Sequence, residues 1–518
     1  MAVALTYPGV YIEEVPSGVR SISGAATAVA AFIGRTQRGP IHEPVLIHSF
    51  ADFERLFGGL WLDSTVSYAV RDFFLNGGGQ AVILRLFQPA KDNTGKDVPA
   101  TAKGTISGLT LEAKNPGKWG NQISVRIDHS DLSQEVADRL GLKLEDLWNL
   151  SVSYTSSTGV TEERFTHVTL KDSPQNVDRM LQASKFVRVP TADGKPVLPD
   201  ASKRPDASAA MRLDGGADSQ PLDVTTYVGD GAKTGLYALD KHEQFSLMVI
   251  PPDVRDGNTS TDVYAAALSY CVKRRAVLLI DPPTEWANRT PAMADLKLSG
   301  AAARNAAVYF PRVLCADPLR RGQIDTFPPS GMIAGVLART DAQRGVWKAP
   351  AGLDAALLGV QGLATRLSDA DNGQLNPQGI NCLRSFPGSG PVIWGARTLR
   401  GSDLMGDEYK YLSVRRLALH IEESLYRGTQ WVVFEPNDEA LWAQIRLNVG
   451  SFMQNLFRQG AFAGQAASEA YFVKCDKEST PKTDVALGIV NIVVGFAPLK
   501  PAEFVVVKLQ QIAGQATS

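Results

Sequence analysis

Short apolar runs that alternate with amphipathic stretches constrain the fold of this chain more than any other feature. Residues 28–34 and 81–86 are continuous apolar runs, and residues 66–75 have the spacing of a helix. Later the same pattern predicts a strand at 245–250, a helix at 261–275, a strand at 276–280, a helix at 291–305 and a strand at 306–314. Units of about thirty residues are typical of βαβ connections, so the sequence predicts an α/β core with a parallel sheet and helices on both faces.

The pattern changes between the two parts of this core. Residues 105–113 and 122–127 alternate in polarity like half-buried antiparallel strands, and residues 190–221 are rich in Pro, Asp, Ala, Ser and Gly. We therefore expect an inserted, mainly β domain at 89–226 that ends in a loose surface loop. The α/β core then comprises residues 25–88 and 227–394.

A compact α+β domain is expected at 395–500. One helix is predicted at about 411–427, and a strongly amphipathic one begins after the Asn-Asp pair at 437–438 and ends at Gly460. Strands are predicted at 471–474 and 489–494.

Both ends of the chain have the composition of short strands. Residues 7–16 and 498–509 are rich in β-branched and aromatic residues and are flanked by Pro or Gly, whereas most termini are polar and frayed. A terminal strand with unpaired N–H and C=O groups is a template for another chain. We expect an N-terminal arm at 1–24 and a C-terminal arm at 501–518 that donate strands to other subunits.

Composition excludes several classes of function. With 53 Lys and Arg against 54 Asp and Glu, the chain has no overall field to attract nucleic acid or an anionic membrane, so no direct contact with either is expected. The start lacks a signal peptide and no apolar run is long enough to span a membrane, so we expect synthesis in the cytoplasm. The four cysteines are spaced for buried packing and not for a metal or redox motif: Cys271, Cys315, Cys382 and Cys475.

No cofactor is expected. The ends of the predicted core strands carry prolines at 251–252, 282–283 and 311, which have no N–H to donate to a phosphate. The glycine-rich segment 229–235 misses the spacing of a P-loop and is interpreted as a tight turn.

No metal site is expected either. The six histidines form no HxxxH or HExxH arrangement. Asp253, Asp256 and Asp262 share one loop without the ligand order of an EF-hand, so we expect solvated carboxylates there.

Two further features leave alternatives open. Ser330 lies among small residues without a GxSxG motif, so a helix-start or turn serine is favoured over a hydrolase nucleophile. The charged residues of the helix at 411–427 form either a solvated face or an ion-pair surface towards another subunit: Arg415, Arg416, Glu422 and Glu423.

A series of short motifs resembles the contractile tail sheath proteins of bacteriophages and related contractile injection systems. The resemblance covers most of the chain. Its motifs lie at 7–14, 115–121, 329–331, 345–351, 379–381, 394–399, 415–416, 434–437 and 497–504, and they read YPGVYIEE, NPGKWGN, PSG, GVWKAPA, GIN, WGARTL, RR, FEPN and APLKPAEF.

The resemblance implies a subtilisin-like topology for the core without protease activity, since the HGTH and GTSM signatures are absent. It implies a non-enzymatic, structural subunit of a sleeve of hexameric rings around an inner tube. Contraction would drive the tube through a target envelope and deliver a genome or an effector. The partners implied are further copies of the chain, the inner tube protein, and baseplate and tail terminator proteins. The sleeve would assemble in the bacterial host cytoplasm and belong to a virion tail or to an extracellular or cell-associated injection particle.

The resemblance also assigns residues to the joint between subunits and places the inserted domain outside the sleeve. The donated strands would contain Val10, Tyr11, Ile12, Val15, Phe504, Val505, Val506, Val507 and Leu509, and the receiving sheet Phe472, Val473, Ile489, Val490 and Ile492. The four charged residues named above, in the helix predicted at 411–427, would face another subunit or the tube. Flexible arms at 16–18 and 498–501 would let the bodies rotate while the strands stay paired.

Two other functions remain in view. One is a serine hydrolase on the subtilisin-like core that uses Ser330. The other is a binding module that presents residues 89–226 to carbohydrate or to a host surface.

Overall fold

A mixed eight-stranded sheet forms the centre of the computed structural model, which describes residues 20–156, 159–231, 233–288 and 290–508. The strand order is β2-β3-β1-β13-β14-β15-β19-β20. The six strands from β3 to β19 run parallel, and β2 and β20 pair antiparallel at the two edges. The predicted α/β class with a parallel-containing sheet is confirmed. The bounds are β1 Val29–Gly34, β2 Val45–Ile47, β3 Gln80–Arg85, β13 Leu247–Val249, β14 Val277–Ile280, β15 Ala306–Phe310, β19 Asn381–Phe386 and β20 Gly390–Ile393.

Helices cover both faces of this sheet because alternate strand residues point to opposite sides. Phe32 and Ile83 belong to a buried cluster with α1 Phe50–Phe57, α2 Val66–Leu75 and α7 Ser330–Arg344. Their neighbours along the strands, such as Ala31 and Val82, pack into a second cluster that includes α6 Thr261–Lys273. All four cysteines are buried and unpaired with one another, as expected from their spacing.

Two predicted elements of the core are wrong. In place of a helix at 291–305 there are two 3-10 turns, Met293–Leu296 and Ala301–Asn305. Between them Lys297 is left-handed and Gly300 has a φ of 76°. The predicted strand at 306–314 is divided at Pro311, which has no N–H for a sheet ladder. Beyond it β16 Val313–Asp317 leaves the central sheet and pairs antiparallel with β17 Gln323–Phe327 and β18 Gly362–Leu363.

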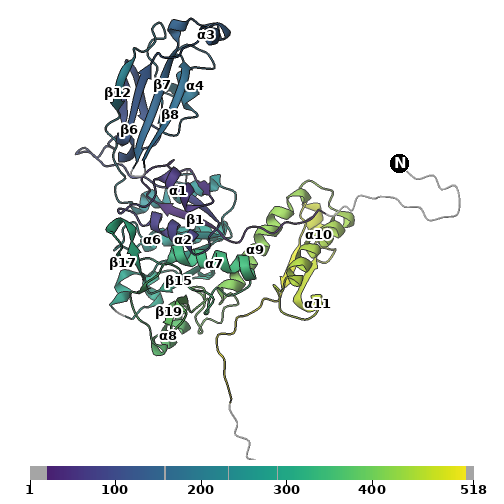
Figure 1. The fold of residues 1–518 in the computed structure, drawn as a ribbon. Helices are drawn as coiled ribbons and strands as arrows, with labels where there is room; N and C mark the ends of the chain where they lie inside the picture. The colour runs from purple at the N-terminus through teal and green to yellow at the C-terminus, as the bar shows by residue number, and fades with distance from the viewer. Residues whose placement is uncertain (1–19, 157–158, 232, 289, 509–518) are drawn as a thin grey trace, which may run out of the picture.

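The inserted segment is mainly β and extends away from the central sheet (Figure 1). It contains a four-stranded sheet of order β12-β6-β7-β8 and a three-stranded sheet of order β4-β5-β9, with a buried core of its own around Trp148. The hairpin β10-β11 and the strand β12 lie where a loose loop was expected at 190–221. The bounds are β4 Lys103–Ile106, β5 Leu109–Ala113, β6 Ile123–Asp128, α3 Gln134–Leu140, β7 Trp148–Ser156, β8 Gly159–Val168, α4 Val177–Leu181, β9 Val187–Arg188, β10 Thr191–Ala192, β11 Lys195–Pro196 and β12 Ser208–Arg212.

Two long helices and a small sheet follow the core. Asp438 caps α10 by accepting a hydrogen bond from the Leu441 amide, and the apolar face of this helix packs Trp442 and Met453 into a fourth cluster. The bounds of the remaining helices and strands are α5 Val224–Val228, α8 Asp369–Leu375, α9 Leu412–Gly428, α10 Glu439–Arg458, α11 Ala467–Ala470, β21 Tyr471–Lys474, α12 Lys482–Ala486 and β22 Val493–Phe496. Among the described residues, no helix is long and apolar enough to cross a membrane.

Candidate intersubunit joint

The C-terminal arm carries a row of exposed apolar side chains. Its described strand-donor residues belong to no strand and are among the most exposed large apolar residues of the chain: Phe504 75%, Val505 84%, Val506 79% and Val507 76%. The other predicted donors, Val10, Tyr11, Ile12, Val15 and Leu509, lie outside the described residues. An apolar, β-prone segment in this state is suited to add a strand to the sheet of another molecule.

A two-stranded sheet, β21-β22, lies where the receiving sheet is predicted, and it is shorter than the predicted strands. Phe472 and Val473 lie in β21, which pairs only with β22 among the described strands, so each of the two strands has an open edge. Half of the Phe472 side chain is exposed. The sheet packs against α10, and each strand keeps one edge to which a further strand could be added.

Ile489, Val490 and Ile492, which are predicted to receive a strand, lie outside β22, which begins at Val493. The strand predicted at 489–494 is therefore wrong in its first half. Asn437 donates to the Ile489 carbonyl (3.0 Å), and the side chain of Asn491 donates to Asp484 (2.6 Å). These side-chain bonds hold the segment as a loop and compete with ladder formation.

The charged pairs on α9 bind within their own chain. Arg416 is buried and forms a two-pronged ion pair with Asp341 of α7, at 2.9 and 2.6 Å. This side chain cannot face the tube or another subunit, so its predicted role is wrong, as is the alternative of a solvated face. The spacing of charges along a helix does not indicate a partner that lies 75 residues away in the chain.

The other three α9 charges also have partners in the chain. Glu423 pairs with Arg275 (3.0 Å) and with Arg427 (2.7 Å), while Arg415 pairs with Glu422 (3.2 Å). The Arg275 contact joins α9 to the residues just after α6. Glu422 is the most exposed of them and is the one best placed for an outside partner.

Ser330 is buried at the first residue of α7. Its hydroxyl donates to Asp281 Oδ2 (2.7 Å) and its backbone N–H donates to Oδ1 (2.9 Å). Burial raises the pKa of Asp281 to about 6. A nucleophile needs substrate access and a base, whereas this serine joins the end of β14 to the start of α7. The position favours the structural role over the hydrolase.

An arginine fills the region where an α/β sheet usually binds nucleotides. Arg312, just after β15, is buried and donates to the carbonyls of Pro282 (3.2 Å), Arg255 (2.9 Å) and Gly257 (2.8 Å). The sequence singled out the prolines at the strand ends and missed this arginine. The sequence feature that could have indicated Arg312 is a cationic residue directly after a strand of apolar residues.

The two ends of the glycine-rich segment 229–235 lie close together. A Cβ atom at Gly235 would lie 2.4 Å from the Gly229 nitrogen, so the backbone approaches too closely for a larger residue. The Thr234 hydroxyl donates to Asp230 (2.6 Å). This geometry agrees with the predicted tight turn.

The loop aspartates are not all solvated. Asp253 is mostly buried, accepts from Arg35 Nε (2.6 Å) and from the Leu222 amide (3.0 Å), and burial raises its pKa. The expectation of a solvated carboxylate is therefore wrong at Asp253. No group of His, Cys, Asp or Glu among the described residues is arranged to hold a metal ion.

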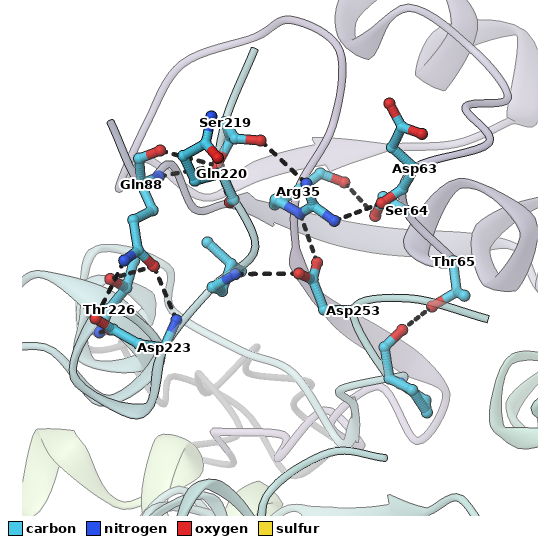
Figure 2. A network of polar contacts seen from close by, with 12 residues as sticks. Arg35, Asp63, Ser64, Thr65, Gln88, Ser219, Gln220, Asp223, Thr226 and Asp253 are labelled. Carbon is cyan, nitrogen blue, oxygen red and sulfur yellow. Dashed lines mark hydrogen bonds and ion pairs between the residues drawn. The ribbon is translucent and has the colours of Figure 1, made fainter. Parts of the chain in front are cut away.

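Figure 2 shows how Arg35 and Asp253 join the inserted segment to the core. Arg35, at the end of β1, donates to the Ser219 carbonyl (3.0 Å) and to the Asp63 carbonyl, so one buried guanidinium contacts three segments. Beside it, the backbone N–H of Gln88 donates to the Ser219 hydroxyl (2.9 Å). The two ends of the insertion are thus held at one point. No local sequence pattern indicates this contact.

Comparison with known proteins follows the same division of the chain. Residues 225–399 match the phage tail sheath protein central domain, and residues 406–512 match the phage tail sheath C-terminal domain. The tail sheath protein of Burkholderia phage BcepMu is 26% identical over 500 residues, which cover 93% of this chain and 91% of that protein.

Solved structures show the same similarity. The helical sheath of the anti-feeding prophage in its contracted state is 25% identical, with a TM-score of 0.58 over 98% of this chain and 100% of that one. A sheath tail protein from Listeria innocua shares the fold at 14% identity, with a TM-score of 0.61 over 92% of this chain and 96% of that one.

Proposed function

Because this chain belongs to the contractile tail sheath protein family and is a structural subunit of that kind, we propose that it polymerises in hexameric rings around an inner tube and contracts to drive the tube through a target cell envelope. In this proposal the subtilisin-like name describes topology only. The inner tube, baseplate and tail terminator proteins are its further partners. Assembly in the bacterial host cytoplasm precedes incorporation into a tail or an extracellular particle.

The exposed segment 504–507 carries this proposal. Its four apolar side chains have no strand partner among the described residues, and the β21-β22 sheet of the same chain has open edges. Copies of one chain can therefore join by adding the arm of one to the sheet of the next. The N-terminal arm would use the second edge.

The binding free energy of one such joint is modest, but the joint recurs at every subunit. One added strand makes roughly four to six backbone hydrogen bonds at about 1 kcal/mol each. The total is enough to hold neighbours together when every subunit both donates and receives. Contraction would draw on the free-energy difference between two packings of the same subunits, without a nucleotide.

Similar proteins support the mechanical part of the proposal. One matching structure is described as the sheath complex of an extracellular contractile injection system in its contracted state, and another as a baseplate with six-fold symmetry. The first shares the fold at 22% identity and the second at 24%. Rings of six copies and a baseplate partner are the corresponding proposals for this chain.

Truncation of each arm tests the proposal. Removing residues 1–19 keeps Arg20, whose guanidinium stacks on Trp431 and whose amide donates to Asn448. Ending the chain after Glu503 keeps the contacts of that residue with the core. We expect both variants to be folded monomers that form no sheaths with the tube protein, as seen by electron microscopy. Normal contractile sheaths from either truncation would refute strand donation.

A further inference from the structure

The C-terminal arm is held at two points before its exposed segment begins. The Ala463 amide donates to the Ala497 carbonyl (2.9 Å), and Phe462 forms a β-bridge with Pro498. Farther along, Glu503 binds Arg397, which is hydrogen-bonded to Asn381 of β19 and so packs with the core. Residues 498–503, which we name the strap, therefore connect the small sheet region to the core, and the sequence-based hinge at 498–501 lies inside this held segment. In Figure 1 the chain runs from the region of α11 to the core before it leaves the molecule.

Arg397 and Glu503 form a two-pronged pair. Arg397 Nε donates to Oε1 (2.8 Å) and Nη2 donates to Oε2 (2.6 Å), and the Arg397 side chain is completely buried. The Tyr411 hydroxyl donates to the same Oε2 (3.1 Å). Parallel bonds from a guanidinium fork fix direction as well as distance, which a single charge contact does not.

Arg397, which binds the Glu503 carboxylate, is held in place by residues outside the arm. The Arg397 backbone N–H donates to Asn381 Oδ1 (2.7 Å), and its Nη1 donates to the Asn376 (2.8 Å) and Gly401 (3.1 Å) carbonyls. Asp403 pairs with both Arg397 and Lys410. Two cations and one carboxylate leave one positive charge, which Glu503 neutralises.

We propose that Arg397 is a positioning residue for strand donation: by holding Glu503 in its own core, it fixes the point from which the donated strand leaves for the neighbouring subunit. This inference rests on the proposed function. Only residues from Phe504 onward are then free to reach the neighbouring subunit. Residues 504–509 span roughly 20 Å when extended, whereas a chain free from Pro498 would span roughly 40 Å.

The consequence concerns which motion a sheath can make. A strand that leaves from a fixed point on the core follows the rotation of the core, so the arm transmits that rotation to the next subunit. If the chain were unattached from Pro498 onward, this flexible segment would change its conformation when the core rotates, and the rotation would not reach the next subunit. The pivot lies after Glu503, and the strap keeps the small sheet region and the core of one subunit in register.

Glu503→Gln tests this role because it keeps the shape of the side chain and removes its charge. The matched control is Glu408→Gln, which removes a carboxylate that is 74% exposed and lies 4.0 Å from Arg304. Spin labels at Val505→Cys and Gln374→Cys, on the arm and on α8, report the position of the arm in the free protein. We expect a narrow distance distribution in the parent and in the control, and a broad one in Glu503→Gln.

Assembly is then measured as the protein concentration needed for sheath formation on tubes. We expect Glu503→Gln to raise it at least about tenfold, the effect of losing one charge-assisted hydrogen bond. Glu503→Asp keeps the charge but has a shorter side chain, so the concentration that it needs should lie between those of the parent and of Glu503→Gln. Circular dichroism should show the same folded core in Glu503→Gln, Glu503→Asp and Glu408→Gln. A merely structural role of the pair would change stability without broadening the distances of the arm, and Glu503→Asp would then not restore part of the assembly.

The outcomes separate this inference from the proposed function. Normal assembly of the chain ending at Glu503 refutes strand donation itself. If that truncation fails to assemble while Glu503→Gln assembles at the parent concentration, donation stands and the positioning role of Arg397 is wrong. A narrow arm distribution in Glu503→Gln also overturns it.

Discussion

The guanidinium of Arg416 on α9 lies 2.6 Å from the carboxylate of Asp341 on α7, and both side chains are almost completely buried. Arg416 also donates to the Thr27 carbonyl (2.9 Å), just before β1. One cation therefore joins a core helix, the first helix after the core and the segment that follows the N-terminal arm. The arrangement couples the region that carries β21 and β22 to the sheet of the core.

Breaking this pair from one side should be costly. We expect Asp341→Ala to lower the free energy of unfolding by about 3–5 kcal/mol, because it leaves a buried guanidinium without its counter-charge. The double variant Asp341→Leu, Arg416→Met should recover much of that loss. Denaturant unfolding of the isolated subunit measures both, and a double variant as unstable as the single one would contradict this reasoning.

The junction in Figure 2 predicts that Asp253 stabilises the attachment of the insertion. Asp253→Asn removes the charge opposite the buried Arg35 and should cost about 1.5–3 kcal/mol. Limited proteolysis should cut faster near residues 88 and 219. Asp256→Asn, an exposed position in the same loop, is the control. Equal cleavage rates in the two variants would show that the junction does not depend on this pair.

Asp281 predicts a pH dependence of stability. Burial raises its pKa to about 6, against an ordinary value of 3.8, so between pH 4 and 6 the folded protein holds a proton that the unfolded chain has released. Stability from this group therefore falls as the pH rises through that window, by up to about 3 kcal/mol. Burial likewise raises the pKa of Asp72 to about 6, with the same sign.

Asp281→Asn should remove its share of that dependence. Relative to the parent, the variant should become more stable as the pH rises from 4 to 6, since it has no buried carboxyl to ionise at this position. Unfolding curves at several pH values give the difference directly. A constant difference across the window would mean that Asp281 titrates as it does in the unfolded chain.

Ser330→Ala should act on folding alone. It removes the hydroxyl bond to Asp281 but keeps the backbone bond, so we expect a loss of about 1 kcal/mol in stability and normal sheath assembly. Thermal unfolding and electron microscopy measure the two. A hydrolytic activity that disappears in this variant while assembly persists would revive the enzyme alternative.

Much of the architecture could be predicted from local patterns. The apolar runs predicted β1, β3, β13 and β14, and helical spacing predicted α2, α6, α9 and α10, because burial imposes a period on each element separately. The errors at 291–305 and at Pro311 arose where a glycine with positive φ or a proline interrupted the pattern.

The segments of the proposed joint were harder to predict from the sequence. The exposed segment 504–507 could be predicted as a β-prone terminus. The start of β22 was predicted too early because side-chain bonds of Asn437 and Asn491 hold residues 489–492 as a loop. The role of Arg416 was missed because its partner on α7 is distant in the chain.

The sequence alone determined the type and order of most elements, the β-prone ends and the family, because these depend on composition and spacing along the chain. Tertiary structure determined which charges are buried together: Arg416 with Asp341, Arg35 with Asp253 and Arg397 with Glu503. Such pairs form between segments that fold against each other, and a low-dielectric interior makes a partner necessary without specifying which residue provides it.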